Sequence, residues 1–206
     1  MRILIVAALT LSACVASAGA TRALEPDGDG ANVSSAATQP RIAVGDVAPA
    51  FTLSDETGAT VNFPSSRPRT TVLVFYRGSW CPYCARQLSE LRGLVKPDES
   101  VDLYTISIDP ASKSAVLADR IGRDGKGALG FRLLSDPDHR VIDSYGLHDE
   151  RYDGGEFAGI PRATVAVINA SGRVTWVRIS EDYKLRPSIA EIRSAIDAAS
   201  GSATTK

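Results

Sequence analysis

Cysteine and histidine are scarce in this sequence. Its 206 residues include three cysteines, Cys14, Cys81 and Cys84, and two histidines, His139 and His148. A structural zinc site takes four ligands of these kinds, and the two thiols outside the N-terminal segment are too few to make one. Each histidine stands among charged residues, so we expect both side chains to face solvent. We therefore expect no resident metal and no cofactor.

An excess of charge of one sign is also missing. Lys and Arg total 23 and Asp and Glu total 24, which gives a formal net charge of −1. The basic residues form no stripe of the kind that follows a phosphate backbone. Nucleic acid is therefore not an expected partner.

Long apolar runs are absent near the N-terminus. The run from Ile3 to Leu11, at about 1.5 Å per residue in a helix, is too short for the ~30 Å hydrocarbon core of a bilayer. It follows the basic Arg2 and precedes small residues, an order typical of a secretory signal. We therefore interpret residues 1–20 as a signal peptide.

Within this segment the letters LSAC, Leu11 to Cys14, are similar to a bacterial lipobox, in which the cysteine becomes a lipidated N-terminus. A lipid on Cys14 would anchor the protein to a membrane without spanning it. The alternative is cleavage after Ala18 or Ala20, which removes Cys14. Both alternatives predict an exported protein of the cell envelope or periplasm.

The rest of the chain divides into a linker and one domain. Residues 21–42 are rich in Ala, Ser, Gly, Asp and Pro and are expected to form a flexible linker. Residues 43–200 suit a single domain with a sizeable core. Once Cys14 is set aside, by lipidation or by cleavage, Cys81 and Cys84 are the thiols of this domain.

Strand patterns recur along the domain. A small hairpin is expected around VNF at 61–63, and the β-branched run at 71–77 is typical of a central strand. Further strands are expected at 101–109 and 131–136. Two more, joined at NASG, are expected within 163–180.

Helix patterns lie between these strands. Pro82 suits the first position of a helix, and apolar residues at helical spacing continue to Val95, before Pro97. Residues 112–122 predict a second helix. Asp136 and Pro137 predict the N-cap and first position of a third.

The last helix is signalled by Ser188 and Glu191, which have capping-box spacing. The order of strands and helices predicts an α/β fold with a mixed central sheet that is covered by helices on both faces.

Cys81 and Cys84 admit three interpretations. A structural disulfide that closes so short a loop contributes only ~2 kcal/mol, which a domain of this size does not need. Two thiols and one histidine would suit Cu(I) in a carrier protein. The third interpretation is a redox-active pair.

The redox interpretation has a clear physical basis. Cys81 falls at the start of the helix that Pro82 opens, where free N–H groups and the helix dipole stabilise an anion. A thiolate placed there is a nucleophile at neutral pH. Cys84 lies one turn further on the same face, where it is able to attack an oxidised Cys81.

Several segments occur in the order seen in one known family: 45–63, VLVFYRGSWCPYC at 72–84, YTISID at 104–109, 131–147 and 160–174. In these the chain resembles the alkyl hydroperoxide reductase/thiol-specific antioxidant family, and in particular its peroxiredoxin-like members. EDYKLRPS at 181–188 also resembles a C-terminal feature of members that read FYRGxWCPxC. The resemblance implies a thioredoxin-like fold and reduction of hydroperoxides through a cysteine sulfenic acid.

The sequence departs from the family at two positions. Peroxiredoxins place a proline seven and a threonine three residues before the reactive cysteine, and the threonine orients the peroxide. Here these positions hold Val74 and Gly78, with Ser79 one step closer to the cysteine. The family's arginine corresponds best to Arg162, and Arg77 is a second candidate for the position beside the thiolate.

WCPYC is also similar to the active site of thioredoxins and glutaredoxins. In those proteins the two cysteines face a cis-proline, for which Pro161 is the candidate here. Trp80 and Tyr83 are then candidates for docking the disulfide of a partner protein, and Pro82 and Tyr83 for tuning the redox potential. Buried aromatic side chains or surface arginines are the alternative interpretation of these residues.

Three functions are therefore expected, in order. The first is a thiol peroxidase in which Cys81 attacks a hydroperoxide and Cys84 resolves it, with Ser79 and one of Arg77 or Arg162 positioning the peroxide. The second is a thiol–disulfide oxidoreductase acting on exported proteins. The third is a copper carrier. Both enzymes would need a thiol electron donor in the cell envelope.

Overall fold

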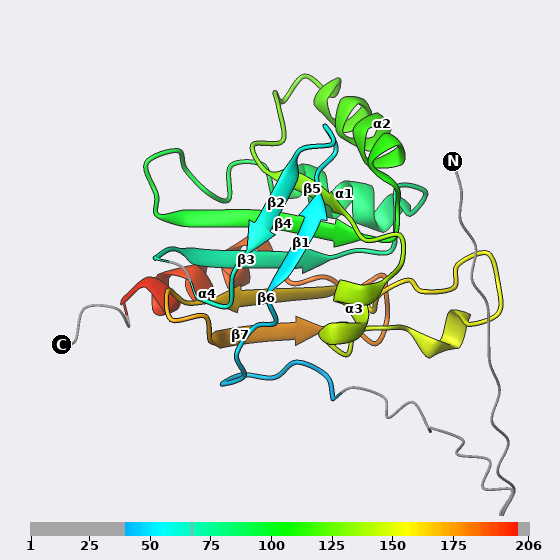
Figure 1. The fold of residues 1–206 in the computed structure, drawn as a ribbon. Helices are drawn as coiled ribbons and strands as arrows, with labels where there is room; N and C mark the ends of the chain where they lie inside the picture. Colours follow the sequence, from blue (N-terminus) through cyan, green and yellow to red (C-terminus); the bar gives the residue numbers. More distant parts are fainter. Residues whose placement is uncertain (1–39, 67, 202–206) are drawn as a thin grey trace, which may run out of the picture. The chain divides into compact units, whose positions relative to one another are not determined.

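The computed structural model describes residues 40–66 and 68–201, and these form a seven-stranded sheet with helices (Figure 1). The predicted signal peptide at 1–20, the predicted lipidation site Cys14 and the predicted linker up to residue 39 lie outside the described residues. Ile42, which the sequence analysis leaves in the linker, is buried, and its N–H donates to the carbonyl of Tyr145 at 3.0 Å. Ordered packing therefore begins before residue 43.

The sheet has the order β2-β1-β5-β4-β3-β6-β7. Strands β3, β4 and β5 run parallel to one another, whereas β6 is antiparallel to β3 and β7 is antiparallel to β6. The strands are β1 Phe51–Ser54, β2 Thr60–Phe63, β3 Thr70–Phe75, β4 Val101–Ser107, β5 Arg132–Ser135, β6 Thr164–Ile168 and β7 Val174–Ile179. The helices are α1 Pro82–Glu90, α2 Ala111–Gly122, α3 Arg140–Ser144, the 3-10 helix η1 Glu150–Tyr152 and α4 Ile189–Gly201.

The central strand β3 is buried on both faces, because its alternate side chains enter two separate cores. Val72 and Val74 pack with residues of α1, α2 and α4. Leu73 and Phe75 pack on the other face with α3 and the β1–β2 hairpin, which crosses in front of the sheet in Figure 1. The predicted mixed sheet with helices on both faces is confirmed.

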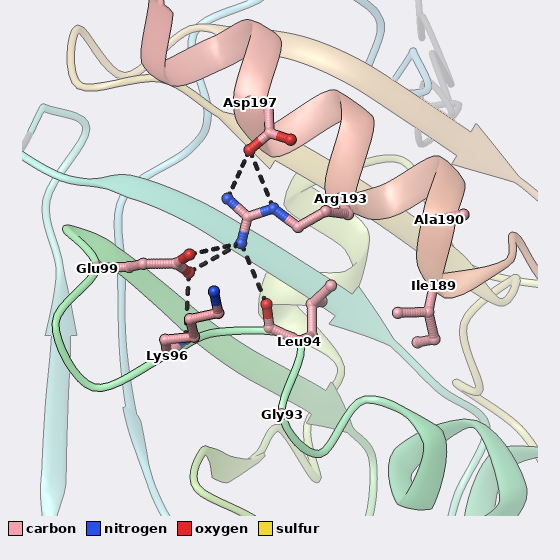
Figure 2. Close-up of a pocket in the computed structure, with 8 residues that line it drawn as sticks. All are labelled: Gly93, Leu94, Lys96, Glu99, Ile189, Ala190, Arg193 and Asp197. Carbon is pink, nitrogen blue, oxygen red and sulfur yellow. Dashed lines mark hydrogen bonds and ion pairs between the residues drawn. The ribbon is translucent and has the colours of Figure 1, made fainter.

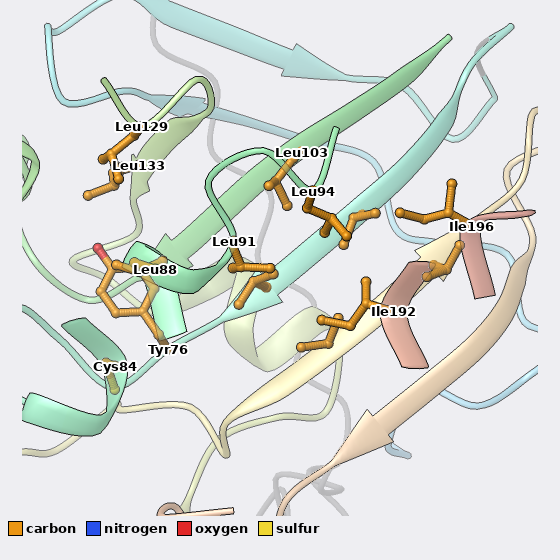
Figure 3. Close-up of a cluster of buried hydrophobic side chains, with 14 of the residues drawn as sticks. Tyr76, Cys84, Leu88, Leu91, Leu94, Leu103, Leu129, Leu133, Ile192 and Ile196 are labelled. Atoms are coloured by element: carbon orange, nitrogen blue, oxygen red, sulfur yellow. The ribbon is translucent and has the colours of Figure 1, made fainter. Parts of the chain in front are cut away.

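Helices α1 and α4 both cover the first of these faces. Figure 3 shows Leu88 and Leu91 from the region of α1, and Ile192 and Ile196 of α4, in one cluster over the sheet. All four side chains are buried. These side chains join α1 and α4 to β3 in one core, which holds the start of α1 at the end of β3.

The first helix is shorter than predicted. The apolar spacing predicts a helix until Pro97, but α1 ends at Glu90 and turns follow. Gly93, two residues beyond the C-cap Leu91, adopts a left-handed conformation (φ 76°), so the helix does not resume toward Pro97. Leu91 and Leu94 are nevertheless buried, so the apolar pattern reflects packing of the turns.

The third helix begins later than predicted. Asp136 and Pro137 were expected to open it, but α3 begins at Arg140 with His139 as the N-cap. Residues 136–139 form a turn in which the N–H of His139 donates to the carbonyl of Asp136 at 2.9 Å. The Asp136 carboxylate accepts the N–H of Ile142 at 2.9 Å, so this residue still caps the helix, from a position further back.

The capping box of the last helix is confirmed. The N–H of Ser188 donates to the Glu191 carboxylate at 2.8 Å, and the N–H of Glu191 donates to Ser188 Oγ at 3.2 Å. Further along α4, Arg193 lies between Asp197 and Glu99 and donates to the carbonyl of Leu94 (Figure 2). These contacts hold α4 to the loop after α1.

Within the described residues, every helix is too short or too polar to cross a membrane.

Candidate active site

The carboxyl end of β3 delivers Cys81 to the start of α1. Residues 76–80 link the strand to the helix, Cys81 is the N-cap with extended dihedral angles (φ −84°, ψ 113°), and Pro82 occupies the first position as predicted. Gly78 allows the tight link: a Cβ atom there would lie 2.6 Å from Nε1 of Trp80. A threonine at this position would therefore need Trp80 to move.

The neighbouring strand β4 fixes the same link. Because β3 and β4 are parallel, their carboxyl ends lie side by side, and Asp109 follows β4 at this edge of the sheet. Its buried carboxylate accepts the N–H of Ser79 at 2.5 Å. Arg120 of α2 donates to the carbonyl of Ser79 at 2.8 Å. The backbone before Cys81 is thus held from both sides.

The two thiols are free and buried, with 1% of Cys81 and none of Cys84 exposed. The backbone N–H of Cys84 donates to Cys81 Sγ at 3.4 Å, as a side chain at an N-cap receives the free amides of the first turn. Figure 3 shows Cys84 near Tyr76, at the border of the apolar core. Cys81 thus lies at the helix end and Cys84 behind it.

The electrostatic environment separates the two thiols. A hydrogen bond from the Cys84 thiol lowers the pKa of Cys81 to about 6, and the Cys84 amide and the charges of Arg186 and Arg77 act in the same direction. Burial opposes this shift but is outweighed. At neutral pH Cys81 is therefore mainly a thiolate.

Cys84 is shifted in the opposite direction. Its hydrogen bond to Cys81, its burial and the negative charge of Cys81 all raise the pKa of Cys84. The Arg77 amide and the Arg186 charge partly offset this increase. The pair therefore carries one negative charge, on Cys81, and one proton, on Cys84.

Arg77 is held by aromatic rings. It is 5% exposed, and its guanidinium carbon lies 4.2 Å from the ring centre of Tyr183, 4.6 Å from that of Tyr152 and 4.8 Å from that of Trp80. Such cation–π contacts keep a desolvated guanidinium charged and in place. The structure thus supplies a fixed cation near Cys81, as predicted for Arg77.

Arg186 is a second cation at the thiols, and the sequence analysis missed it as a site residue. Its Nη2 lies 3.7 Å from Cys84 Sγ, and its Nε donates to the buried Gln87 of α1 at 2.9 Å. Arg186 and Tyr183 belong to the segment EDYKLRPS, whose family resemblance was the available signal. Asp109, likewise missed, ends the resembling segment YTISID.

Unlike Arg77 and Arg186, Arg162 lies against two carboxylates. Its Nη1 pairs with Glu181 at 2.7 Å and its Nη2 lies 3.8 Å from Asp149. Its backbone N–H donates to the carbonyl of Leu147 at 2.7 Å. The cations that lower the pKa of Cys81 are Arg186 and Arg77. A peroxide-positioning role for Arg162 stays a prediction.

The other predicted residues surround the thiols to different degrees. Trp80 is 41% exposed and stacks on Phe157 with ring centres 4.3 Å apart. Tyr83 meets Tyr183 edge to face at 5.7 Å. Pro161 is buried and pairs with His148 in an isolated bridge, and a role for it opposite the cysteines stays a prediction.

The histidines do not join the cysteines. Among the described residues, one group of three potential metal ligands lies within mutual reach, and it consists of His139, Asp143 and His148. A copper site made of both thiols and a histidine is thus not assembled in this part of the chain. Both histidine side chains are partly exposed, 40% for His139 and 28% for His148, and the two rings lie together, which the sequence analysis did not predict.

Fold and site define a class of protein: an α/β redox protein with a thiolate at a helix start and a second thiol behind it. Comparison with known proteins narrows the class. The model of the AhpC/TSA family matches residues 44–177, and the chain belongs to that family.

Individual relatives agree with this family assignment. The chain is 33% identical over 145 residues to peroxiredoxin Bcp of Escherichia coli, covering 68% of this chain and 86% of the relative. Among solved structures, peroxidoxin BcpB of Mycobacterium tuberculosis aligns with a TM-score of 0.62 at 25% identity, covering 77% of this chain and 98% of that one. A peroxiredoxin-like protein of Aquifex aeolicus aligns with a TM-score of 0.68 at 18% identity, covering 79% and 90%. The thioredoxin-like fold implied by the sequence is thereby confirmed.

Replacing Arg186 by alanine is expected to raise the pKa of Cys81, because one of the two cations that stabilise its thiolate is removed. Less thiolate is then present at neutral pH, and alkylation of Cys81 by iodoacetamide slows. The measurement is the alkylation rate as a function of pH, with the modified cysteine identified by mass spectrometry.

Arg178→Ala is the matched control, since Arg178 is exposed and paired with Glu191. It should leave the pH profile unchanged. A profile for Arg186→Ala that coincides with that of the unaltered protein would show that Arg186 does not act on the thiolate.

Proposed function

We propose that this protein is a thiol peroxidase that reduces hydroperoxides with Cys81 and regenerates through a Cys81–Cys84 disulfide. The observation that carries the proposal is the unequal state of the two thiols at the start of α1, with the pKa of Cys81 lowered to about 6 and that of Cys84 raised. Membership of the AhpC/TSA family and the likeness to peroxiredoxin Bcp support it.

In the first step the Cys81 thiolate attacks the terminal oxygen of the hydroperoxide. A sulfur–oxygen bond forms, the oxygen–oxygen bond breaks, and the leaving alkoxide or hydroxide takes up a proton. Cys81 is oxidised to a sulfenic acid, and the peroxide is reduced to an alcohol or water. Arg77 and Ser79 are the proposed positioning residues for the peroxide, because Arg77 is held near the thiolate and Ser79 lies in the link before Cys81.

The second step depends on the first. While Cys81 is an anion, its hydrogen bond and its charge raise the pKa of Cys84. Oxidation of Cys81 to the neutral sulfenic acid removes that charge, and Arg186 remains 3.7 Å from Cys84 Sγ. Cys84 then loses its proton more easily and attacks the sulfur of Cys81, which forms the disulfide and releases water.

A dithiol donor completes the cycle by reducing the disulfide with two electrons and two protons. We infer that the protein is exported and anchored through a lipid on Cys14, so that this donor acts in the cell envelope. The signal-like residues 1–20 and the letters LSAC support this part of the proposal.

A thiol–disulfide oxidoreductase is the second candidate, and two observations favour it. Gly78 stands where peroxiredoxins have the threonine that orients the peroxide, and its neighbour Trp80 is 41% exposed beside Cys81. An exposed aromatic ring at a reactive cysteine suits contact with the chain of a protein substrate.

Rapid mixing of the reduced protein with hydrogen peroxide separates the two candidates. A peroxidase should be oxidised orders of magnitude faster than free cysteine, because its thiolate is preformed and its substrate is positioned. An oxidation rate equal to that of free cysteine, together with reduction of insulin disulfides, would transfer the assignment to the second candidate.

Single cysteine variants test the division of roles. Cys84→Ser should consume one equivalent of peroxide and stop at a sulfenic acid that dimedone traps, whereas Cys81→Ser should be inert. Mass spectrometry of the products supplies the readout. Equal partial losses in the two variants would contradict the assigned roles.

The mature N-terminus tests the proposed anchor. Mass spectrometry of the protein isolated from membranes should show a lipidated Cys14 as the first residue. An unmodified start at Gly19 or Thr21 would contradict lipidation, while leaving the export prediction intact.

A further inference from the structure

The two histidines of this chain lie together around one carboxylate. His139 Nδ1 lies 2.8 Å from one oxygen of Asp143, and His148 Nδ1 lies 3.4 Å from the other. The centres of the two rings are 5.3 Å apart. With only two histidines in 206 residues, both have one nitrogen directed at the same acid.

His148 has the orientation of a metal ligand. Its Nε2 is hydrogen-bonded to Asp153 at 2.7 Å. A carboxylate that binds one ring nitrogen holds the proton there, so that the other nitrogen keeps a lone pair, and metal-binding histidines commonly have such a partner. In the tautomer of His148 that donates from Nε2 to Asp153, the acceptor nitrogen is Nδ1, the one that faces Asp143.

Asp143 has capacity to bind a cation. Its Oδ1 atom is buried and accepts no hydrogen bond, although His148 Nδ1 is close. A carboxylate oxygen in this state lacks the partners that a buried acceptor normally has. A cation between Asp143 and the two rings would satisfy it.

The backbone of His139 is also unusual. It is the one residue other than glycine with a positive φ angle, 46°, in the part of the chain that the structure describes. Its ring lies against Gly159, where a Cβ atom would come within 2.7 Å of it. A left-handed backbone is unfavourable for a side-chain-bearing residue and needs support from its surroundings. This conformation aims the ring of His139 at Asp143, four residues further along.

We propose that His139, Asp143 and His148 form a zinc-binding site, in which Asp153 orients His148. Two imidazole nitrogens and one carboxylate oxygen are ligands that Zn²⁺ and similar first-row divalent ions accept, and Mg²⁺ and Ca²⁺ prefer oxygen alone. Three protein ligands leave the fourth tetrahedral position for water.

The geometry requires only small movements. The candidate ligand atoms of the three residues lie within 4.8 Å of one another. Around tetrahedral zinc, ligands with bonds of about 2.0–2.1 Å stand roughly 3.3 Å apart. Side-chain rotation is available because the three side chains are between 28% and 42% exposed, which also leaves a path for the ion.

A bound ion would join three parts of the chain. His139 precedes α3, Asp143 lies within it, and His148 belongs to the segment that pairs with Pro161. Asp153 directly follows Tyr152, whose ring contacts Arg77. The zinc site would thus be a cross-link on the face of the sheet that α3 covers. It lies next to Tyr152, one of the aromatic residues whose rings contact Arg77.

The test is a zinc titration of the full chain without a histidine tag and with Cys14, Cys81 and Cys84 replaced by serine, so that no thiol competes. Because the chain has only two histidines, its NMR spectrum contains two sets of imidazole signals. Both sets should shift together and saturate at one equivalent of Zn²⁺, and calorimetry should give the same stoichiometry.

Variants assign the site. His148→Ala should abolish one-to-one binding, and Asp153→Asn should weaken it by about tenfold or more, as is usual for a carboxylate that orients a ligand. Asp138→Asn is the matched control, since Asp138 is an exposed acid beside Arg140, and it should bind as the parent does. Melting curves without zinc verify that each variant is folded.

Three results would overturn the proposal. They are imidazole signals that do not move at one equivalent, movement of one ring alone, and equal affinity in the parent and in a folded His148→Ala variant. Asp143→Asn provides a second check, because it keeps the size of the side chain and removes the charge that the ion needs.

Discussion

The chemistry of this protein depends on the contact between one sulfur atom and the start of a helix. Cys81 Sγ accepts a hydrogen bond from the backbone N–H of Cys84 at 3.4 Å, and the Cys84 thiol donates a second hydrogen bond to it. Together with two arginine charges these contacts outweigh burial, which by itself favours the neutral thiol. The same contacts keep the proton on Cys84. Attack by one thiol and resolution by the other are therefore set by one local arrangement.

The rest of the domain serves to hold this arrangement. Parallel pairing of β3 and β4 brings Asp109 to the backbone before Cys81, and α1 shares one buried core with α2, α4 and β3. The segment after β7 is distant in sequence but contributes two residues to the site: Tyr183 contacts Arg77, and Arg186 contacts Cys84. Burial of both cysteines keeps competing water from the charges and strengthens their effect.

The sequence predicts those parts of the site that depend on neighbours along the chain. Pro82 at a helix start, Cys81 before it and the capping box of Ser188 and Glu191 are local patterns, and the structure confirms them. Asp109 reaches the site because β4 pairs with β3, and Arg186 because the segment after β7 folds back to the thiols. Residue spacing encodes neither contact. The end of α1 was misplaced because the apolar spacing continues through the buried turn residues Leu91 and Leu94. The start of α3 was misplaced because Asp136 and Pro137 have the pattern of a helix start but form a turn before His139.

The central claim is that Cys81 carries the negative charge and Cys84 keeps its proton. A direct measurement is the pH titration of the Cβ signals of both cysteines by NMR, in the reduced protein labelled with ¹³C at cysteine. The account predicts that Cys81 titrates at about pH 6 while Cys84 stays protonated well into the alkaline range. A Cys81 that titrates near the ordinary thiol value of about 8.5, or a Cys84 that titrates first, would contradict it.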